Sequence, residues 1–178
     1  NQASDFLMML HSTGAYNPAY PLGTEMALPC VVIGAGLTAV DAATEAQTYY
    51  LQLVQTVNLR LSRAIEMTSQ SQVKAAFSAH EWTQLQQWAF HGGQLRRLKQ
   101  EATRRGISPC YRALLSEWGG VHLIYRGQLT ASPAYRKNHQ ELQSALDAGI
   151  IFHAQTDVVR ANMDTHGSVC ELACLQPW

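Results

Sequence analysis

A short apolar run followed by helical spacing is the clearest pattern near the start of the chain. Residues 30–33 read Cys-Val-Val-Ile, and a fully apolar strand of this kind is typical of a parallel sheet covered on both faces. From Leu37 onward, apolar residues recur three and four positions apart, as at Ala39, Val40 and Ile65. The pattern predicts a strand over 30–33 and a helix from about 37 to 67.

Helical signals continue through the middle of the chain. The polar residues 68–72 are expected to break the first helix. Ser78 stands three positions before Glu81, a spacing that forms a capping box at a helix start. We expect this second helix to be interrupted at 92–93, where two glycines stand together, and to end at Gly106.

A short third helix is expected to complete this region, because Ser108 is a cap and Pro109 suits the first helical position. The glycines at 119–120 would end it. Residues from about 50 to 119 are therefore predicted to form an all-helical insertion. Its own core is expected to contain the aromatic residues Trp82, Trp88 and Phe90.

The rest of the chain alternates strands with one helix. Apolar residues predict strands over 121–125 and 150–154, and Ser132-Pro133 begins a helix between them. Two further strands, over 156–161 and 168–174, are expected to form a hairpin. The predicted fold class is α/β, with an all-helical insertion and a C-terminal β-hairpin.

Composition restricts the partners that such a fold is expected to have. The 178 residues include 13 Lys and Arg and 13 Asp and Glu, so the formal net charge is +0. This balance argues against nucleic acid or an acidic membrane held by bulk electrostatics, and no apolar run reaches the roughly 20 residues of a membrane span. The four cysteines form no Cys-x-x-Cys motif, and we expect free, mostly buried thiols in a reducing cytoplasm. The histidines show no metal-ligand spacing, so no metal site is expected.

A glycine turn separates the first strand from its helix. Gly34, Gly36 and Ala39 match the dinucleotide fingerprint, in which glycines let a pyrophosphate approach the backbone and a small third residue lets the helix pack on the strand. The helix N-terminus would present free N–H groups and the positive end of its dipole to the phosphates. Nucleotide binding is the interpretation we favour, and the alternative is a turn that serves packing alone.

Arg126 follows the second strand, where a residue that recognises the ribose belongs if 50–119 is an insertion. A carboxylate at this place binds the 2′-hydroxyl of NAD, whereas a cation suits the 2′-phosphate of NADP. Tyr125 stands beside Arg126, and no carboxylate does. The sequence therefore favours NADP, while the alternative is an ordinary surface arginine at a strand end.

The order of these motifs resembles the NAD(P)H-binding domain of the glutamate synthase small-subunit family and of related FAD-dependent pyridine nucleotide-disulfide oxidoreductases, in which a helical insertion also precedes the second strand. The relatives typically carry a second arginine where this chain has Gly127, and often an asparagine where it has Leu37. The resemblance rests on Thr38-Ala39-Val40-Asp41, Tyr125-Arg126, Ser132-Pro133-Ala134, Glu141 and Gly149-Ile150-Ile151-Phe152.

The resemblance implies a Rossmann-like dinucleotide-binding domain that is a fragment of a larger, cytoplasmic flavoprotein. Residues 1–28 would connect it to an upstream FAD-domain segment, and residues 29–178 would form the NAD(P)H-binding domain. It would place the nicotinamide of NADPH, or of NADH, for hydride transfer to FAD in the parent, with no catalytic side chain of its own and no activity as a fragment. The cofactor-binding residues would be Gly34, Ala35, Gly36, Leu37, Thr38, Ala39, Tyr125 and Arg126.

A second class of function stays open. A degenerate Rossmann scaffold could act in protein–protein interaction through the helical insertion. There, Arg96-Arg97 and Arg104-Arg105 would form either a solvated helical face or a docking surface for a protein partner.

Overall fold

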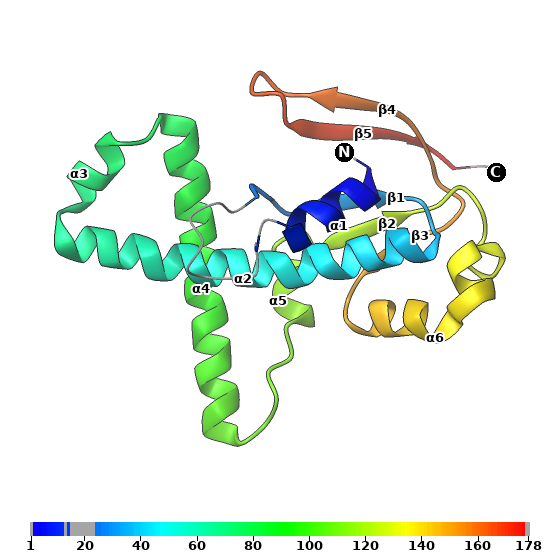
Figure 1. The fold of residues 1–178 in the computed structure, drawn as a ribbon, viewed down its shortest axis with the longest axis horizontal. Helices are drawn as coiled ribbons and strands as arrows, with labels where there is room; N and C mark the ends of the chain where they lie inside the picture. Colours follow the sequence, from blue (N-terminus) through cyan, green and yellow to red (C-terminus); the bar gives the residue numbers. More distant parts are fainter. Residues whose placement is uncertain (1, 13, 15–23, 177–178) are drawn as a thin grey trace. The chain divides into compact units, whose positions relative to one another are not determined.

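The structure is a computed structural model that describes residues 2–12, 14 and 24–176, and it is mixed α/β (Figure 1). The chain divides into two compact units. The α/β unit comprises Asn1–Met9, Ala27–Gln47 and Leu115–Trp178, and the helical unit comprises Leu10–Met26 and Thr48–Leu114.

A three-stranded parallel sheet organises the α/β unit. Its strands are β1 (Cys30–Ile33), β2 (Val121–Ile124) and β3 (Ile151–His153), in the order β1-β2-β3. Cys30 pairs with Val121 and Ile33 with Ile124, so β1 and β2 start and end together. These strands confirm the three that the apolar runs predict, to within one residue at each end. Because the strands are parallel, their carboxyl ends lie at one edge of the sheet.

Two helices bury small residues in the α/β unit. The helix α2 (Leu37–Met67) begins there, and α6 (Pro133–Asp147) starts at the predicted Ser132 cap, with Pro133 at its first position. The Gln47 side chain at the unit's edge donates a 3.0 Å hydrogen bond to the Ala148 carbonyl, which ties α2 to the end of α6. Small side chains let a helix approach its neighbours closely. The buried residues of these helices include Ala39, Val40, Ala42, Ala43 and Ala46 of α2, and Ala134, Leu142 and Ala145 of α6.

The predicted C-terminal hairpin is confirmed as an antiparallel pair, β4 (Asp157–Met163) and β5 (Val169–Leu175). All four cysteines are free thiols, as expected. The expectation that most of them are buried is wrong, because Cys110, Cys170 and Cys174 are exposed. Two of the three lie on β5, a strand of a two-stranded sheet that buries little of either face.

Helices are the only regular secondary structure between residues 50 and 119, all of which the structure describes. The predicted α2 is confirmed from Leu37 to Met67, and it is followed by α3 (Gln70–Ala75), α4 (Ala79–Arg105) and α5 (Arg112–Glu117). The remaining helices of the described chain are α1 (Ala3–Ser12) and the 3₁₀ helix η1 (Leu129–Ala131). The capping box of Ser78 and Glu81 opens α4, and Gly106 ends it in the left-handed region, both as predicted.

The polar residues 68–72 break the first helix as predicted, since α2 ends at Met67, and α3 starts within this stretch at the Ser69 cap, whose side chain accepts a hydrogen bond from the Gln72 N–H. Two other local predictions in this region are wrong. The glycines at 92–93 do not interrupt α4, which runs through them without a break. Ser108-Pro109 starts no helix, and α5 begins only at Arg112.

The core of the helical unit is aromatic. Trp82 and Trp88 are buried as expected, but Phe90 is 64% exposed, so its assignment to the core is wrong. Tyr50 is fully buried, and its hydroxyl lies 2.7 Å from Nδ1 of His91. Burial raises the pKa of Tyr50, which keeps the phenol neutral. Among the helices of the described residues, none has the length and apolarity to cross a bilayer.

Candidate functional site

The glycine turn after β1 is held against the end of β2. The Gly34 N–H donates a 2.8 Å hydrogen bond to the Ile124 carbonyl, which extends the pairing of the two strands by one residue. Gly34 has φ of +130°, a conformation that strains any other residue. The chain can therefore turn sharply from β1 into α2, and the buried Ala35 follows in the turn.

Gly36 is a glycine for a different reason. Its φ does not lie in the left-handed region, and a Cβ built on it would meet no protein atom within 4 Å. Its carbonyl accepts hydrogen bonds from the N–H groups of Ala39 and Val40, at 3.0 and 3.1 Å, which begin α2. The turn thus leaves open space where a side chain would stand, directly at the start of a helix.

The two N–H groups that follow Gly36 at the start of α2 have no protein partner among the described residues. Leu37 is half-buried and Thr38 is exposed, and neither backbone N–H donates to a protein group in the described part of the chain. The first turn of α2 carries no acidic residue. Free N–H groups and the positive end of the helix dipole favour an anion here.

Tyr125 and Arg126 leave the sheet at the same edge as the glycine turn. The Tyr125 N–H donates to the His153 carbonyl at 2.9 Å, and the Tyr125 carbonyl accepts from the Thr156 N–H at 3.0 Å. This pairing fixes the backbone, while the Arg126 side chain is exposed. No hydrogen bond or ion pair of the Arg126 guanidinium occurs within the described residues, so the group is available to a ligand.

Gly127, the residue after Arg126, lies against the ring of Tyr125. A Cβ at Gly127 would come 2.8 Å from Cε1 of that ring. The Gly127 carbonyl also accepts a 2.9 Å hydrogen bond from the Gln155 N–H. A larger residue at 127 would have to displace the Tyr125 ring. The observed position of Tyr125 therefore requires a glycine at 127 and excludes a second arginine there.

The start of α6 is fixed to the glycine turn. The Ala134 N–H donates to the Ala35 carbonyl at 2.9 Å. Ser132 is fully buried, and its hydroxyl caps α6 by accepting from the Tyr135 N–H at 3.2 Å. The turn is therefore supported from two sides, by β2 and by the start of α6.

Two carboxylates lie close together where α2 and α6 meet, which the sequence pattern did not indicate. A side-chain hydrogen bond with Asp41 raises the pKa of Glu141, and partial desolvation and the negative charge of Asp41 act in the same direction. Asn138 opposes this effect, because its Nδ2 donates to Glu141 Oε2 at 2.8 Å. The spacing Asn138-x-x-Glu141 is a capping pattern, and it is the one signal in the sequence that could have located this contact.

A histidine pair joins β2 to β3 and was also missed. Nε2 of His122 lies 2.7 Å from the Gly119 carbonyl, so that nitrogen carries a proton. Nδ1 of His122 lies 2.8 Å from Nε2 of His153 and accepts from it when His122 is neutral. Partial burial and then the proximity of His122 lower the pKa of His153. In the described ranges, no group of three or more ligating side chains could hold a metal ion.

The structure thus brings together the residues that the fingerprint and the second strand point to. Six of them form the turn and the first helical residues, and Tyr125 and Arg126 emerge from the neighbouring strand. The arrangement can bind and orient an anionic ligand. The six are Gly34, Ala35, Gly36, Leu37, Thr38 and Ala39.

No model of a known protein family matches the chain. The chain is 30% identical over 167 residues, 94% of its length, to Uncharacterized protein RP006 of Rickettsia prowazekii (strain Madrid E). The matched residues make up 21% of that protein, so the chain spans about a fifth of the length of the curated relative it matches. The name of that relative assigns no activity, and the functional argument therefore depends on the site.

Proposed function

We propose that this chain is the NAD(P)H-binding portion of a flavoprotein oxidoreductase with two dinucleotide-binding domains, similar to glutamate synthase small subunits. Its parallel strands, glycine turn and α2 would form a Rossmann-like nucleotide site. The observation that carries the proposal is the open space at Gly36 beside the unpartnered N–H groups of α2. A pyrophosphate needs such space, and the helix start supplies its hydrogen bonds.

A residue that follows the neighbouring strand β2 favours a nucleotide whose ribose carries a phosphate. Arg126 is exposed and has no ion pair among the described residues. It lies two residues after Ile124, the last residue of β2, whose carbonyl accepts the hydrogen bond from Gly34 of the glycine turn. A guanidinium here can bind a 2′-phosphate through two parallel hydrogen bonds, which supports NADP over NAD.

The contribution of this chain to the reaction would be binding and orientation. When bound, the dinucleotide supplies a hydride from its nicotinamide ring, and the acceptor would be FAD held by the rest of the parent. The residues of the turn hold the phosphates, and Arg126 with Tyr125 fixes the adenosine end. No catalytic side chain is assigned in this chain.

Titration calorimetry of NADPH into the 178-residue chain tests the proposal, with Gly36→Val as the variant. The valine side chain would fill the space at Gly36, so we expect NADPH affinity to fall at least 10-fold, equivalent to the loss of one charge-assisted hydrogen bond of about 1.5–3 kcal/mol. No protein atom opposes the new Cβ, so the fold should persist. The poorer helix start should cost about 1 kcal/mol of stability.

The thermal unfolding of Gly36→Val is the control for folding. If the folded variant binds NADPH as tightly as the wild type, the glycine turn does not bind the phosphates. Wild-type protein that binds neither NADPH nor NADH would contradict the proposal and favour the scaffold alternative. The exposed Phe90 on α4 would then be the first residue to test in protein–protein contact.

A further inference from the structure

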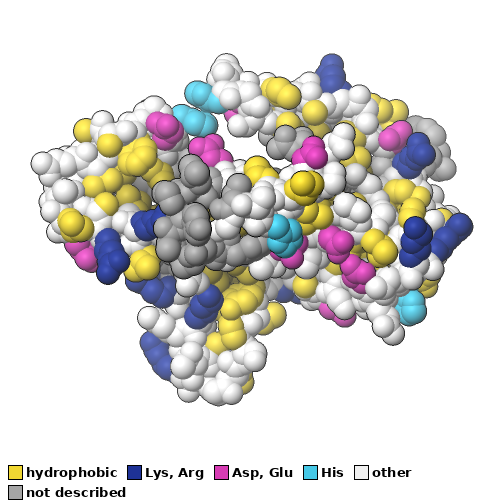
Figure 2. Space-filling view, in the orientation of Figure 1, with side chains coloured by type: hydrophobic (Ala, Val, Ile, Leu, Met, Phe, Trp, Pro, Cys, Tyr) yellow, Lys and Arg dark blue, Asp and Glu magenta, His cyan; other side chains and the backbone are white. Residues whose placement is uncertain are grey.

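The neutral net charge of the chain conceals a strongly basic helical segment. Residues 48–114 contain nine of the 13 Lys and Arg residues but three of the 13 Asp and Glu residues, a formal charge of +6. Figure 2 shows Lys and Arg side chains gathered over α4 and the adjoining part of α2. The excess of positive charge therefore belongs to the helical unit, away from the glycine turn in the sequence.

Part of this charge lines a groove between α2 and α4 with a volume of about 600 Å³. Gly92 lies where the two helices meet, since a Cβ there would collide with the Val54 carbonyl. Three cationic side chains and three amide side chains line the groove, and its described lining includes no carboxylate. The cations are Arg96, Lys99 and Arg104, and the amides are Gln55, Asn58 and Gln100.

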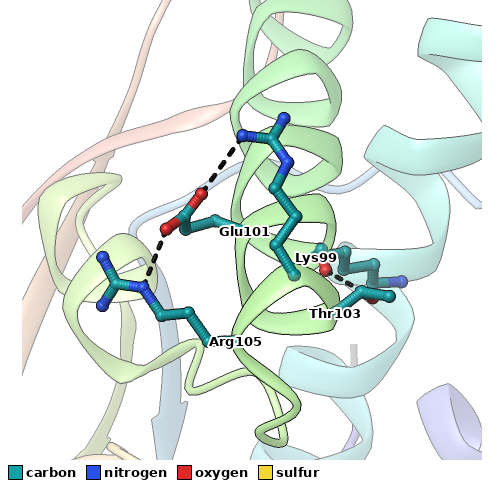
Figure 3. Close-up of polar contacts among 5 residues, drawn as sticks. Lys99, Glu101, Thr103 and Arg105 are labelled. Atoms are coloured by element: carbon teal, nitrogen blue, oxygen red, sulfur yellow. Dashed lines mark hydrogen bonds and ion pairs between the residues drawn. The ribbon is translucent and has the colours of Figure 1, made fainter.

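Lys99 is held at the groove by contacts on both sides. Its Nζ donates to Oε1 of Gln55 at 2.5 Å, and it lies 5.9 Å from the centre of the Tyr111 ring. Figure 3 shows Lys99 and Thr103 on one side of α4, while Glu101 and Arg105 lie on the other. A half-buried lysine with a neutral partner keeps its positive charge unneutralised at the groove.

The carboxylate of Glu101, on the same helix, forms its ion pairs with arginines and not with Lys99 or Arg96. Glu101 pairs with Arg105 at 2.7 Å and with Arg104 at 3.4 Å. In the described part of the chain, Arg96 forms no ion pair, and it stands eight residues before Arg104 on α4. Arg96 and Lys99 therefore bring to the groove two positive charges that form no ion pair among the described residues, while the charge of Arg104 is shared with Glu101.

We propose that this groove binds a small polyphosphate anion, such as the triphosphate of a nucleotide. The groove has the volume of a small-molecule site. Arginine forks and a lysine ammonium are the side chains that bind phosphate oxygens, and several linked phosphates match charges spread along one helix. No aromatic ring is among the described residues that line it, so a single-stranded nucleic acid would lack the stacking surfaces it uses.

Calorimetric titration of inorganic triphosphate tests this site, in a Gly36→Val background so that the glycine turn does not contribute. We expect binding that weakens as salt is raised, because the charges are partly exposed. Arg96→Gln and Lys99→Gln should each weaken binding at least 10-fold. Arg97→Gln is the matched control, since Arg97 is an exposed neighbour on α4 that does not line the groove, and it should leave affinity unchanged.

Nucleoside triphosphate and a short single-stranded RNA form the other arms of the experiment. A nucleotide that binds as inorganic triphosphate does, with the same dependence on Arg96, would show that phosphates carry the recognition. Absence of triphosphate binding to the Gly36→Val protein overturns the proposal, as does an equal loss in Arg96→Gln and Arg97→Gln. RNA that binds through Arg96 while triphosphate does not would also overturn it, in favour of a nucleic-acid surface.

Discussion

Gly34 and Gly36 are separated by one residue, and glycine stands at the two positions for different reasons. Gly34 has φ of +130°, so any side chain there would strain the backbone. Gly36 has room for a side chain, and nothing in the protein explains why none is present. On the proposed function, a ligand phosphate approaches the backbone in this space, as the fingerprint in the sequence predicts.

Arg126 is the residue whose loss should distinguish the two nucleotides. Its guanidinium would bind the 2′-phosphate that NADPH carries and NADH lacks. Loss of a charge-assisted contact worth about 1.5–3 kcal/mol should weaken NADPH by roughly 10- to 100-fold in Arg126→Ala, while NADH binding stays nearly unchanged. Paired calorimetric titrations of both nucleotides measure the difference.

Arg160→Ala is the matched control, because Arg160 is another exposed arginine of the α/β unit, on β4. It should change neither affinity. Equal losses for NADPH and NADH in Arg126→Ala would mean that Arg126 supports the strand end and does not read the 2′-phosphate. Since Gly127 follows Arg126 and no second arginine stands beside it, we expect only a modest NADPH preference in the wild type.

At the level of elements, the contact of α4 with α2 depends on one glycine of an adjacent pair. A Cβ at Gly92 would collide with the Val54 carbonyl and the Asn58 side chain, whereas a Cβ at Gly93 would lie 3.7 Å from Asn58 Nδ2. Gly92→Ala should therefore destabilise the protein by about 1–3 kcal/mol through overpacking. Gly93→Ala should be neutral or stabilising by up to about 1 kcal/mol, because alanine favours helix.

Chemical denaturation of the two alanine variants gives the comparison directly. The pair has nearly the same helix context, so the difference between the variants isolates the helix contact. Equal stability of Gly92→Ala and Gly93→Ala would show that α2 and α4 do not meet at Gly92.

The Glu141 carboxyl on α6, close to Asp41 on α2, is expected to make the stability of the protein depend on pH. The pKa of Glu141 is raised in the folded state above its ordinary value of 4.5. The folded state therefore holds the proton to higher pH than the unfolded state, and stability falls as pH rises through that window. Glu141→Gln removes the repulsion and can still bond Asn138, so it should raise stability at pH 7 by no more than about 1 kcal/mol.

Thermal unfolding of wild type and Glu141→Gln between about pH 4 and pH 7 measures this effect. The difference between their melting temperatures should widen in favour of the variant as pH rises. Asp41→Asn removes the other member of the pair and should behave in the same way. A constant difference across the pH range would contradict the carboxylate contact.

Element boundaries show where sequence patterns stop being informative. The capping box at Ser78 and the proline after Ser132 were sufficient to place the starts of α4 and α6, because a cap is a local interaction. Ser108-Pro109 has the same local signal and starts no helix. The paired glycines at 92–93 suggested a break, but one of them serves a contact with Val54, which is distant in the sequence. Contacts of this kind cannot be read from local spacing.

For the whole molecule, the distribution of charged residues along the chain says more about its anionic partners than the net charge does. The total of +0 argued against nucleic acid or an acidic membrane held by bulk electrostatics, whereas residues 48–114 alone carry +6. The positions of the glycine turn and of Arg126 at one edge of the sheet could be predicted, because each follows a recognisable strand. The groove could not, since its cations on α4 are brought to Gln55 and Asn58 of α2 only by helix packing. The same holds for His122 and His153, which adjacent strands bring together.

The central claim is that a dinucleotide binds at the glycine turn, and amide chemical shifts on titration with NADPH test it most directly. We predict that the largest changes occur at the N–H groups of Gly36, Leu37 and Thr38, with further changes at Tyr125 and Arg126, because these groups would contact the phosphates and the ribose. Gly36→Val should abolish this set of changes. Changes absent from these residues, or confined to the helical unit while the turn is unaffected, would contradict the account.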